Sequence, residues 1–279
     1  VTVQENASEV LKSTKPDIVI HTTGSKLDRV FGQFEEILKA GVNVVSTCEE
    51  LGYPYKRHPE LSVQLDELAK KHGATVLATG INPGFLMDTW PLVMTGVCRE
   101  VKAVTVTRIQ DATSRRVPFQ QKIGAGLTRE EFQKKVDSGD FGHVGLPESI
   151  YMIADGLNWD IDSIEETIEP VMLDHVVKSD YITVESGKAA GLKQTAYGYS
   201  KGKILITMDF QAYLGAPESY DEVQTEGIPP MKVRVIGGTQ GDIGTVSIVI
   251  NAIPRVVDSE PGLKTMKDIP MVICGSSYE

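Results

Sequence analysis

Three short apolar runs, separated by two segments with helical periodicity, constrain this chain more than any other feature. The runs are Asp17–His21, Val42–Ser46 and Ala74–Ala78, and each has the length and composition of a buried parallel strand. Between them lie Leu27–Ala40, in which apolar side chains recur every three or four residues, and Pro59–His72. Short strands that alternate with helices predict an α/β fold with a doubly wound parallel sheet.

Beyond residue 100 the pattern changes from continuous apolar runs to alternation. Val101–Ile109 alternates apolar and polar side chains, as a strand with one buried face does. Helices are expected over Thr128–Ser138, where Thr128 and Glu131 form a capping box, and over Pro147–Gly156. Further strands are expected at residues 164–173, 181–185, 189–199, 204–210 and 231–236. This half predicts an α+β domain built on a mostly antiparallel sheet.

Charge and composition exclude several classes of function. The net charge of −10, with Arg115–Arg116 as the one pair of adjacent arginines, argues against a nucleic-acid partner. No apolar run approaches the roughly 20 residues of a membrane helix. The three cysteines, Cys48, Cys98 and Cys274, have neither zinc nor disulfide spacing, so we expect small buried side chains, no metal and a cytoplasmic location.

The ends of the three apolar runs are rich in glycine and polar side chains. They are His21–Ser25, Ser46–Glu50 and Thr79–Gly84. Ligands of parallel sheets bind where the strands end, so these loops predict a ligand site. No G-x-G-x-x-G turn follows a strand near the start. The stretch Gly237–Gly244 could pass for a phosphate loop, but no further strand–helix unit follows it.

Five motifs spread along the chain carry a family resemblance. They are Ser46–Pro54, Thr79–Phe85, Gly142–Ser149, Ala190–Tyr199 and Pro261–Pro270. Taken together, they resemble the 2,4-diaminopentanoate dehydrogenase family. The wider group is the dihydrodipicolinate-reductase-like two-domain dehydrogenases, which also contains amine dehydrogenases acting on simple ketones and amines. Dihydrodipicolinate reductase itself is rejected, because its paired histidines are absent here.

The resemblance implies a domain plan. Residues 1–90 are expected to form a partial Rossmann-type dinucleotide-binding domain, and residues 91–255 an α+β substrate-binding domain. Residues 256–279 are expected to be a tail that packs back over the surface. Family members open with a strand, a glycine-rich turn, a helix and a second strand. We therefore expect an N-terminal truncation of about two strand–helix units, which would impair binding of NAD or NADP.

The resemblance also implies a reaction, the NAD(P)-dependent oxidative deamination of 2,4-diaminopentanoate to 2-amino-4-oxopentanoate, or its reverse. One glutamate of the pair Glu49 and Glu50 is implied as the acid/base. Adjacent side chains on an extended segment point opposite ways, so only one is expected to face the ligand, and the sequence does not say which. The alternative is that both acids face the dipole of a helix start.

Cofactor contacts are expected from two of the loops. By analogy, His21, Thr22 and Thr23 would approach the nicotinamide ribose or pyrophosphate. A turn formed by Asn82, Pro83 and Gly84 permits close backbone approach to the nicotinamide amide. The alternatives are a loop that caps the next helix through Ser25, and an ordinary crossover turn between the domains.

Substrate contacts are expected from the second half of the chain. Arg108 could clamp a substrate carboxylate, and His143 could orient the amine or relay a proton. Gln194 and Tyr197 lie on one predicted strand, which we expect to line the pocket. The alternatives are a surface salt bridge for Arg108 and a loop-stabilising role for His143. We expect the remaining three histidines to be solvated and assign them no role. They are His58, His72 and His175.

Two other functions stay open. One is an amine dehydrogenase for simple ketones and amines, and the other is a non-catalytic dinucleotide-binding sensor, against which the intact Glu49–Glu50 pair argues. The expected partner is a small-molecule amine or amino acid. By analogy with the family, we also expect a homo-oligomer, a dimer, that pairs through the sheet of the second domain.

Overall fold

A computed structural model of the chain describes residues 2–275, which fold into two compact units. Unit 1 contains the described residues up to Trp90, the short range 151–156 and the chain from Gln240 onward. Unit 2 contains 91–150 and 157–239. These boundaries differ from the expected ones, because the helix that follows Thr239 and the whole C-terminal segment pack with unit 1.

Unit 1 is built on a parallel sheet of four strands in the order β1-β2-β3-β12. The strands are β1 (Ile18–His21), β2 (Asn43–Ser46), β3 (Thr75–Ala78) and β12 (Gly262–Lys264), and every neighbouring pair is parallel. The first three are the apolar runs of the sequence, so the expected doubly wound α/β sheet is confirmed. Each parallel strand ends at the same edge, which brings the loops that follow together.

Helices cover both faces of this sheet. Helices α2 (Leu27–Lys39) and α3 (Pro59–His72) pack on each other and on one face, where Phe34 and Leu65 are fully buried. The other face is covered by α8 (Gly241–Val257), which contacts β1, β2 and β3. A short helix, α1 (Ala7–Thr14), precedes the sheet and is capped by the side chain of Asn6. Residue 1 lies outside the described residues, and residues 2–5 form no strand.

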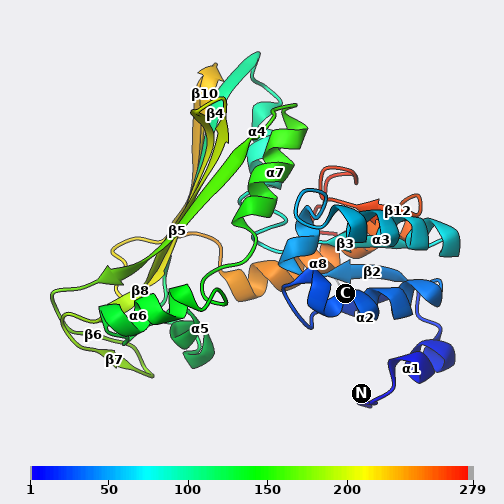
Figure 1. Ribbon diagram of the computed structural model, residues 1–279, viewed down its shortest axis with the longest axis horizontal. Helices are drawn as coiled ribbons and strands as arrows, with labels where there is room; N and C mark the ends of the chain where they lie inside the picture. The colour runs from blue at the N-terminus through cyan, green and yellow to red at the C-terminus, as the bar shows by residue number, and fades with distance from the viewer. Residues whose placement is uncertain (1, 276–279) are drawn as a thin grey trace. The chain divides into compact units, whose positions relative to one another are not determined.

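The C-terminal segment is more than the expected tail that packs back over the surface. Pro254 lies inside α8, and β12 pairs with β3 at the edge of the sheet, as Figure 1 shows near the red end of the chain. Leu263, opposite Val76, is buried in the core of unit 1. A three-residue strand is too short to produce periodicity in the sequence, so only its partner β3 reveals it.

Unit 2 is built on a sheet of six strands in the order β11-β10-β4-β9-β8-β5. The strands are β4 (Glu100–Asp111), β5 (Ser163–Met172), β8 (Ala189–Ser200), β9 (Lys203–Tyr213), β10 (Tyr220–Ile228) and β11 (Met231–Ile236). All neighbours are antiparallel except β4 and β9, so the mostly antiparallel sheet is confirmed. The sequence did not predict β10, whose three acidic side chains are unusual in a strand.

Shorter elements complete unit 2 and the connections. They are α4 (Thr89–Thr95), α5 (Val117–Lys122), α6 (Arg129–Asp137), α7 (Leu146–Gly156), β6 (Val177–Lys178) and β7 (Thr183–Val184). The expected capping box of α6 is present, since Thr128 and Glu131 exchange both hydrogen bonds. In the part of the chain that the structure describes, no helix is long and apolar enough to cross a membrane.

Because Leu263 belongs to the core, we expect Leu263→Ala to lower the free energy of unfolding of unit 1 by about 2–4 kcal/mol. The control is Met271→Ala in the same segment, where the side chain is 62% exposed and the change should stay within about 0.5 kcal/mol. Urea unfolding followed by circular dichroism measures both. Equal, small effects would mean that the C-terminal segment does not belong to the core.

Candidate functional site

Backbone hydrogen bonds join the three loops at the carboxyl edge of the parallel sheet. Thr47 donates its N–H to the carbonyl of His21 at 3.0 Å, and Thr79 donates to Ser46 at 2.8 Å. Glu50 donates its N–H to the carbonyl of Ser25 at 3.1 Å. These bonds continue the strand ladder into the loops, so the polar residues that follow β1, β2 and β3 form one connected edge.

The His21 side chain is buried in unit 1, and both of its ring nitrogens have hydrogen-bond partners there. Its Nδ1 lies 2.9 Å from the Ser46 hydroxyl and its Nε2 lies 2.9 Å from the Gln33 amide oxygen. An amide oxygen can only accept, so Nε2 carries the proton and Nδ1 accepts from Ser46. The ring packs on Phe34 with 4.3 Å between centroids, and burial lowers the His21 pKa. The expected contact of His21 with a cofactor is therefore not supported, whereas Thr22 and Thr23 beside it are exposed.

The turn after β3 is compact. Gly84 has φ +127° and a Cβ there would lie 2.3 Å from the Gly80 nitrogen, so only glycine fits. Its N–H donates to the Asp88 carboxylate at 2.7 Å. The Thr79 hydroxyl at the start of this turn is buried and has no hydrogen-bond partner among the described residues. Asn82 and Pro83, joined by a cis peptide bond, lie at the centre of the turn.

The two glutamates after β2 have different surroundings. They begin a short 3₁₀ helix, η1 (Glu49–Gly52), rather than an extended segment. The Glu50 side chain is only 6% exposed and accepts from the Leu27 N–H at 2.9 Å and from His58 Nε2 at 2.7 Å. Glu50 thus caps the start of α2, which matches the helix-dipole alternative for this residue. Glu49 is half-buried.

The η1 turn touches the turn after β3. A Cβ at Gly52 would lie 3.0 Å from Cγ of Pro83, so the two turns are in van der Waals contact. The structure therefore brings the predicted catalytic pair and the predicted cofactor residues Asn82–Gly84 together at one edge of the sheet. This close approach also explains the glycine at position 52.

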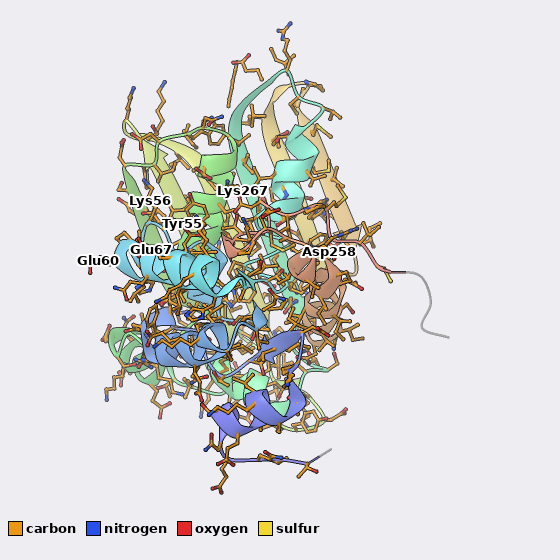
Figure 2. The ribbon with its side chains drawn as sticks, turned by 90° about the vertical axis from the view of Figure 1, so that its right-hand side faces the viewer. Tyr55, Lys56, Glu60, Glu67, Asp258 and Lys267 are labelled. Atoms are coloured by element: carbon orange, nitrogen blue, oxygen red, sulfur yellow. The ribbon has the colours of Figure 1, made fainter. Side chains whose placement is uncertain are left out.

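A polar cluster supports the segment that follows η1. Lys267 Nζ lies 3.0 Å from the carboxylates of both Asp155 and Asp268, and Figure 2 shows Lys267 close to Tyr55. Burial alone would lower the pKa of Lys267, but the two carboxylates outweigh it and raise the pKa. Burial also raises the pKa of Tyr55 to about 12, so the phenol stays neutral at physiological pH. Tyr53, two residues before Tyr55, forms a side-chain hydrogen bond with Asp155.

In unit 2, three of the predicted residues surround one aromatic ring. The strand registers place Gln194, Phe210 and Arg108 side by side on β8, β9 and β4, on the same face of the sheet. The His143 ring packs on Phe210 with 4.9 Å between centroids. Tyr197 is an odd number of residues from Gln194 and lies on the opposite face, near Tyr199. The expectation that Gln194 and Tyr197 line one pocket is therefore wrong.

Arg108 has a structural role, because its guanidinium bonds to groups of unit 2 itself. Its side chain is 2% exposed, with Nη1 at 2.5 Å from the Asp221 carboxylate and Nη2 at 2.9 Å from the Thr239 carbonyl. Asp221 also accepts the Thr239 N–H at 2.7 Å. Burial lowers the Arg108 pKa while Asp221 counteracts it. A buried guanidinium held in this way does not fit the expected clamp on a substrate carboxylate, and it is not a surface salt bridge either.

Gln194 holds the loop that carries His143. Its amide oxygen accepts from the His143 N–H and its amide nitrogen donates to the His143 carbonyl, both at 2.7 Å. Gly142 has φ +102°, and a Cβ there would lie 2.8 Å from the Gln194 amide oxygen. Gln194 is therefore a support for the loop, and this network matches the loop-stabilising alternative for the His143 backbone.

His58 is not solvated, contrary to the expectation from the sequence. Its side chain is 17% exposed, and its Nε2 bonds to the Glu50 carboxylate. One signal was available, since His58 directly precedes Pro59 at the first position of α3 and so lies at a helix start, close in sequence to Glu50. His72 and His175 play no part in the contacts described above.

Comparison with known proteins now adds to this geometry. Residues 85–277 match the family described as the 2,4-diaminopentanoate dehydrogenase C-terminal domain. The chain is 36% identical over 270 residues to a 2,4-diaminopentanoate dehydrogenase from Acetoanaerobium sticklandii, covering 94% of this chain and 76% of that protein. The chain belongs to the 2,4-diaminopentanoate dehydrogenase family. The expected resemblance is thus confirmed, and the family is one of oxidoreductases acting on amines.

Two amine dehydrogenases are more distant relatives. One from Streptomyces virginiae is 21% identical and covers 94% of this chain and 80% of that protein. A solved amine dehydrogenase from Mycobacterium smegmatis superimposes with a TM-score of 0.83 at 23% identity, covering 97% of this chain and 80% of that one. At this level of identity, the similarity to the solved amine dehydrogenase supports the fold of this chain and nothing further. The fold agrees with the one expected from the resemblance to the 2,4-diaminopentanoate dehydrogenase family.

Because Arg108 and Asp221 form a buried pair, we expect Arg108→Met to lower the free energy of unfolding by about 3–5 kcal/mol. The control is Lys39→Met, which removes an exposed ion pair with Glu35 and should cost about 0–1 kcal/mol. Thermal and urea unfolding measure both. An Arg108→Met protein of normal stability with a raised KM for an amino acid would restore the clamp hypothesis.

Burial keeps His21 neutral, so acid should destabilise unit 1. Its pKa is lowered from 6.5, so the unfolded chain binds more protons as the pH falls below about 6.5. The stability is present above that pH and is lost below it. Urea midpoints between pH 8 and pH 5 should show this loss in the wild type and less of it in His21→Gln. His175→Gln, at an exposed position, should behave as the wild type.

Proposed function

We propose that this chain catalyses the nicotinamide-dependent oxidative deamination of 2,4-diaminopentanoate to 2-amino-4-oxopentanoate, with reductive amination as the reverse. The observation that carries the proposal is the contact between the η1 turn, with its pair of glutamates, and the Asn82–Gly84 turn at the carboxyl edge of the sheet. The level of identity to a 2,4-diaminopentanoate dehydrogenase supports this substrate.

The residues at this edge fit a nicotinamide in part. The buried, unpartnered Thr79 hydroxyl and the glycines at positions 80 and 84 would receive the amide end, and the exposed Thr22 the ribose. Thr23 is less suited, because its hydroxyl already donates to the Gln33 amide oxygen at 2.5 Å. The start of α2 is a poor phosphate site, because Glu50 already occupies its Leu27 N–H. When bound, NAD or NADP would accept a hydride from the carbon that bears the amine.

Glu49 is the carboxylate to which we assign the proton transfers. The substrate ammonium must lose a proton before its lone pair can help to expel the hydride, and the resulting iminium must then gain a water. Glu49 would take the ammonium proton and release it to solvent, then take a proton from the attacking water and return it to the departing amine. The products are the ketone, ammonium, the reduced nicotinamide and one proton released to solvent. Glu50 is less suited to this role because its carboxylate already accepts from Leu27 and His58.

Unit 2 carries one more residue that we propose for the substrate, and the proposed surface for an oligomer. His143 stays our candidate for orienting the amine, on a loop held by Gln194. The sheet face that carries Tyr197 and Thr207 is partly exposed, and we propose that two copies pair through it.

The test is reduction of NAD and NADP, assayed separately, by the wild type, Glu49→Gln and Glu50→Gln with 2,4-diaminopentanoate, simple amines and amino acids. We expect diamine-dependent reduction and a fall in kcat of about 10²–10⁴-fold in Glu49→Gln. Glu50→Gln is the matched control. It keeps an oxygen for Leu27 and His58, so its kcat should fall much less.

Other outcomes would change the assignment. A larger loss in Glu50→Gln than in Glu49→Gln would exchange the roles of the two residues. Reduction with simple amines alone would favour the amine dehydrogenase reading. Dinucleotide binding without reduction by any amine would favour a non-catalytic sensor and contradict the proposal.

A further inference from the structure

We infer that His58 is a positioning residue, which acts through Glu50 to hold the η1 turn and thereby the carboxylate of Glu49. The inference rests on the proposed function, because it concerns the geometry of the proposed acid/base. The proposed effect of His58 passes through the Glu50 carboxylate, to which its Nε2 donates.

Glu50 is the junction between two helix starts. One carboxylate oxygen accepts both the N–H of Leu27, the first residue of α2, and Nε2 of His58, which directly precedes α3. The other oxygen lies 3.7 Å from Nη1 of Arg57. Both helix starts carry partial positive charge, so each attracts the carboxylate that lies between them. A carboxylate oxygen accepts hydrogen bonds, so His58 Nε2 is the donor of this bond.

His58 is itself held firmly on its backbone. Its carbonyl accepts from the N–H of Ser62 at 2.9 Å and from the Ser62 hydroxyl at 2.7 Å, and its N–H donates to Pro54 at 2.8 Å. Although it occupies the N-cap position of α3, its side chain makes no capping bond to that helix. The ring is therefore anchored at its base by α3 and directed at Glu50.

These hydrogen bonds connect η1 to the starts of both α2 and α3. Glu50 is fixed at its N–H by Ser25 and at its carboxylate by Leu27 and His58. Glu49 precedes it directly, so the direction in which the Glu49 side chain leaves the backbone depends on how Glu50 is held. If the His58 bond is lost, the turn loses its tie to α3 and the Glu49 carboxylate is placed less accurately. A misplacement of about 1 Å can cost about 10²-fold in rate.

The test compares His58→Leu, which removes the donor, with His58→Gln, which keeps an N–H at the end of the side chain. We expect His58→Leu to lower kcat for the diamine about 10–100-fold with little change in KM, and His58→Gln to restore kcat to within a few-fold of the wild type. His72→Leu, at the other end of α3, is the matched control and should leave kcat unchanged. Circular dichroism and urea midpoints identify any variant that does not fold.

A second measurement does not depend on turnover. The ¹H–¹⁵N spectrum of the wild type should contain a protected His58 Nε2–H signal that disappears in Glu50→Ala and in His58→Gln. A wild type that oxidises no amine would overturn the proposed function, and the role of His58 with it. An active wild type with an equally active His58→Leu, or an Nε2–H signal indifferent to Glu50→Ala, would overturn this inference alone.

Discussion

The parallel pairing of β1, β2 and β3 is the constraint on which unit 1 depends. Parallel strands all end at the same edge, so the loops that follow them meet whether or not they are close in the sequence. Here backbone bonds from Thr47 and Thr79 extend the ladder past the strand ends. The η1 turn and the Asn82–Gly84 turn are separated by about thirty residues of chain, yet Gly52 of η1 touches Pro83 because β2 and β3 are neighbours.

Buried polar groups explain most of the differences between the expected and the observed roles. An isolated arginine or histidine in a sequence looks like a residue available for a ligand. Folding removes these groups from water, and a buried charge or donor is stable only with partners. Arg108 finds Asp221 and Thr239, and His21 finds Ser46 and Gln33. Their chemistry is used to hold the strands, which leaves little for a ligand.

The separation of Glu49 from Glu50 follows the same principle. Two identical side chains stand next to each other, but one is drawn between two helix starts and the other is left half-buried at the turn. The helix starts decide this difference, because unsatisfied N–H groups attract the carboxylate within reach. Glu50 thereby becomes part of the scaffold, and the proposed function accordingly assigns the proton transfers to Glu49.

The sequence by itself determined the local elements and the family. Apolar runs, helical periodicity and the capping box at Thr128 all act within a few residues, so the sequence predicts them directly, and the family motifs are local too. Only the tertiary structure decided that β12 joins the sheet, that β10 pairs with β4, and that His58 meets Glu50. The reason is physical. These outcomes depend on which distant segments become neighbours, and a strand of three residues or a single histidine carries no local signal of its partner.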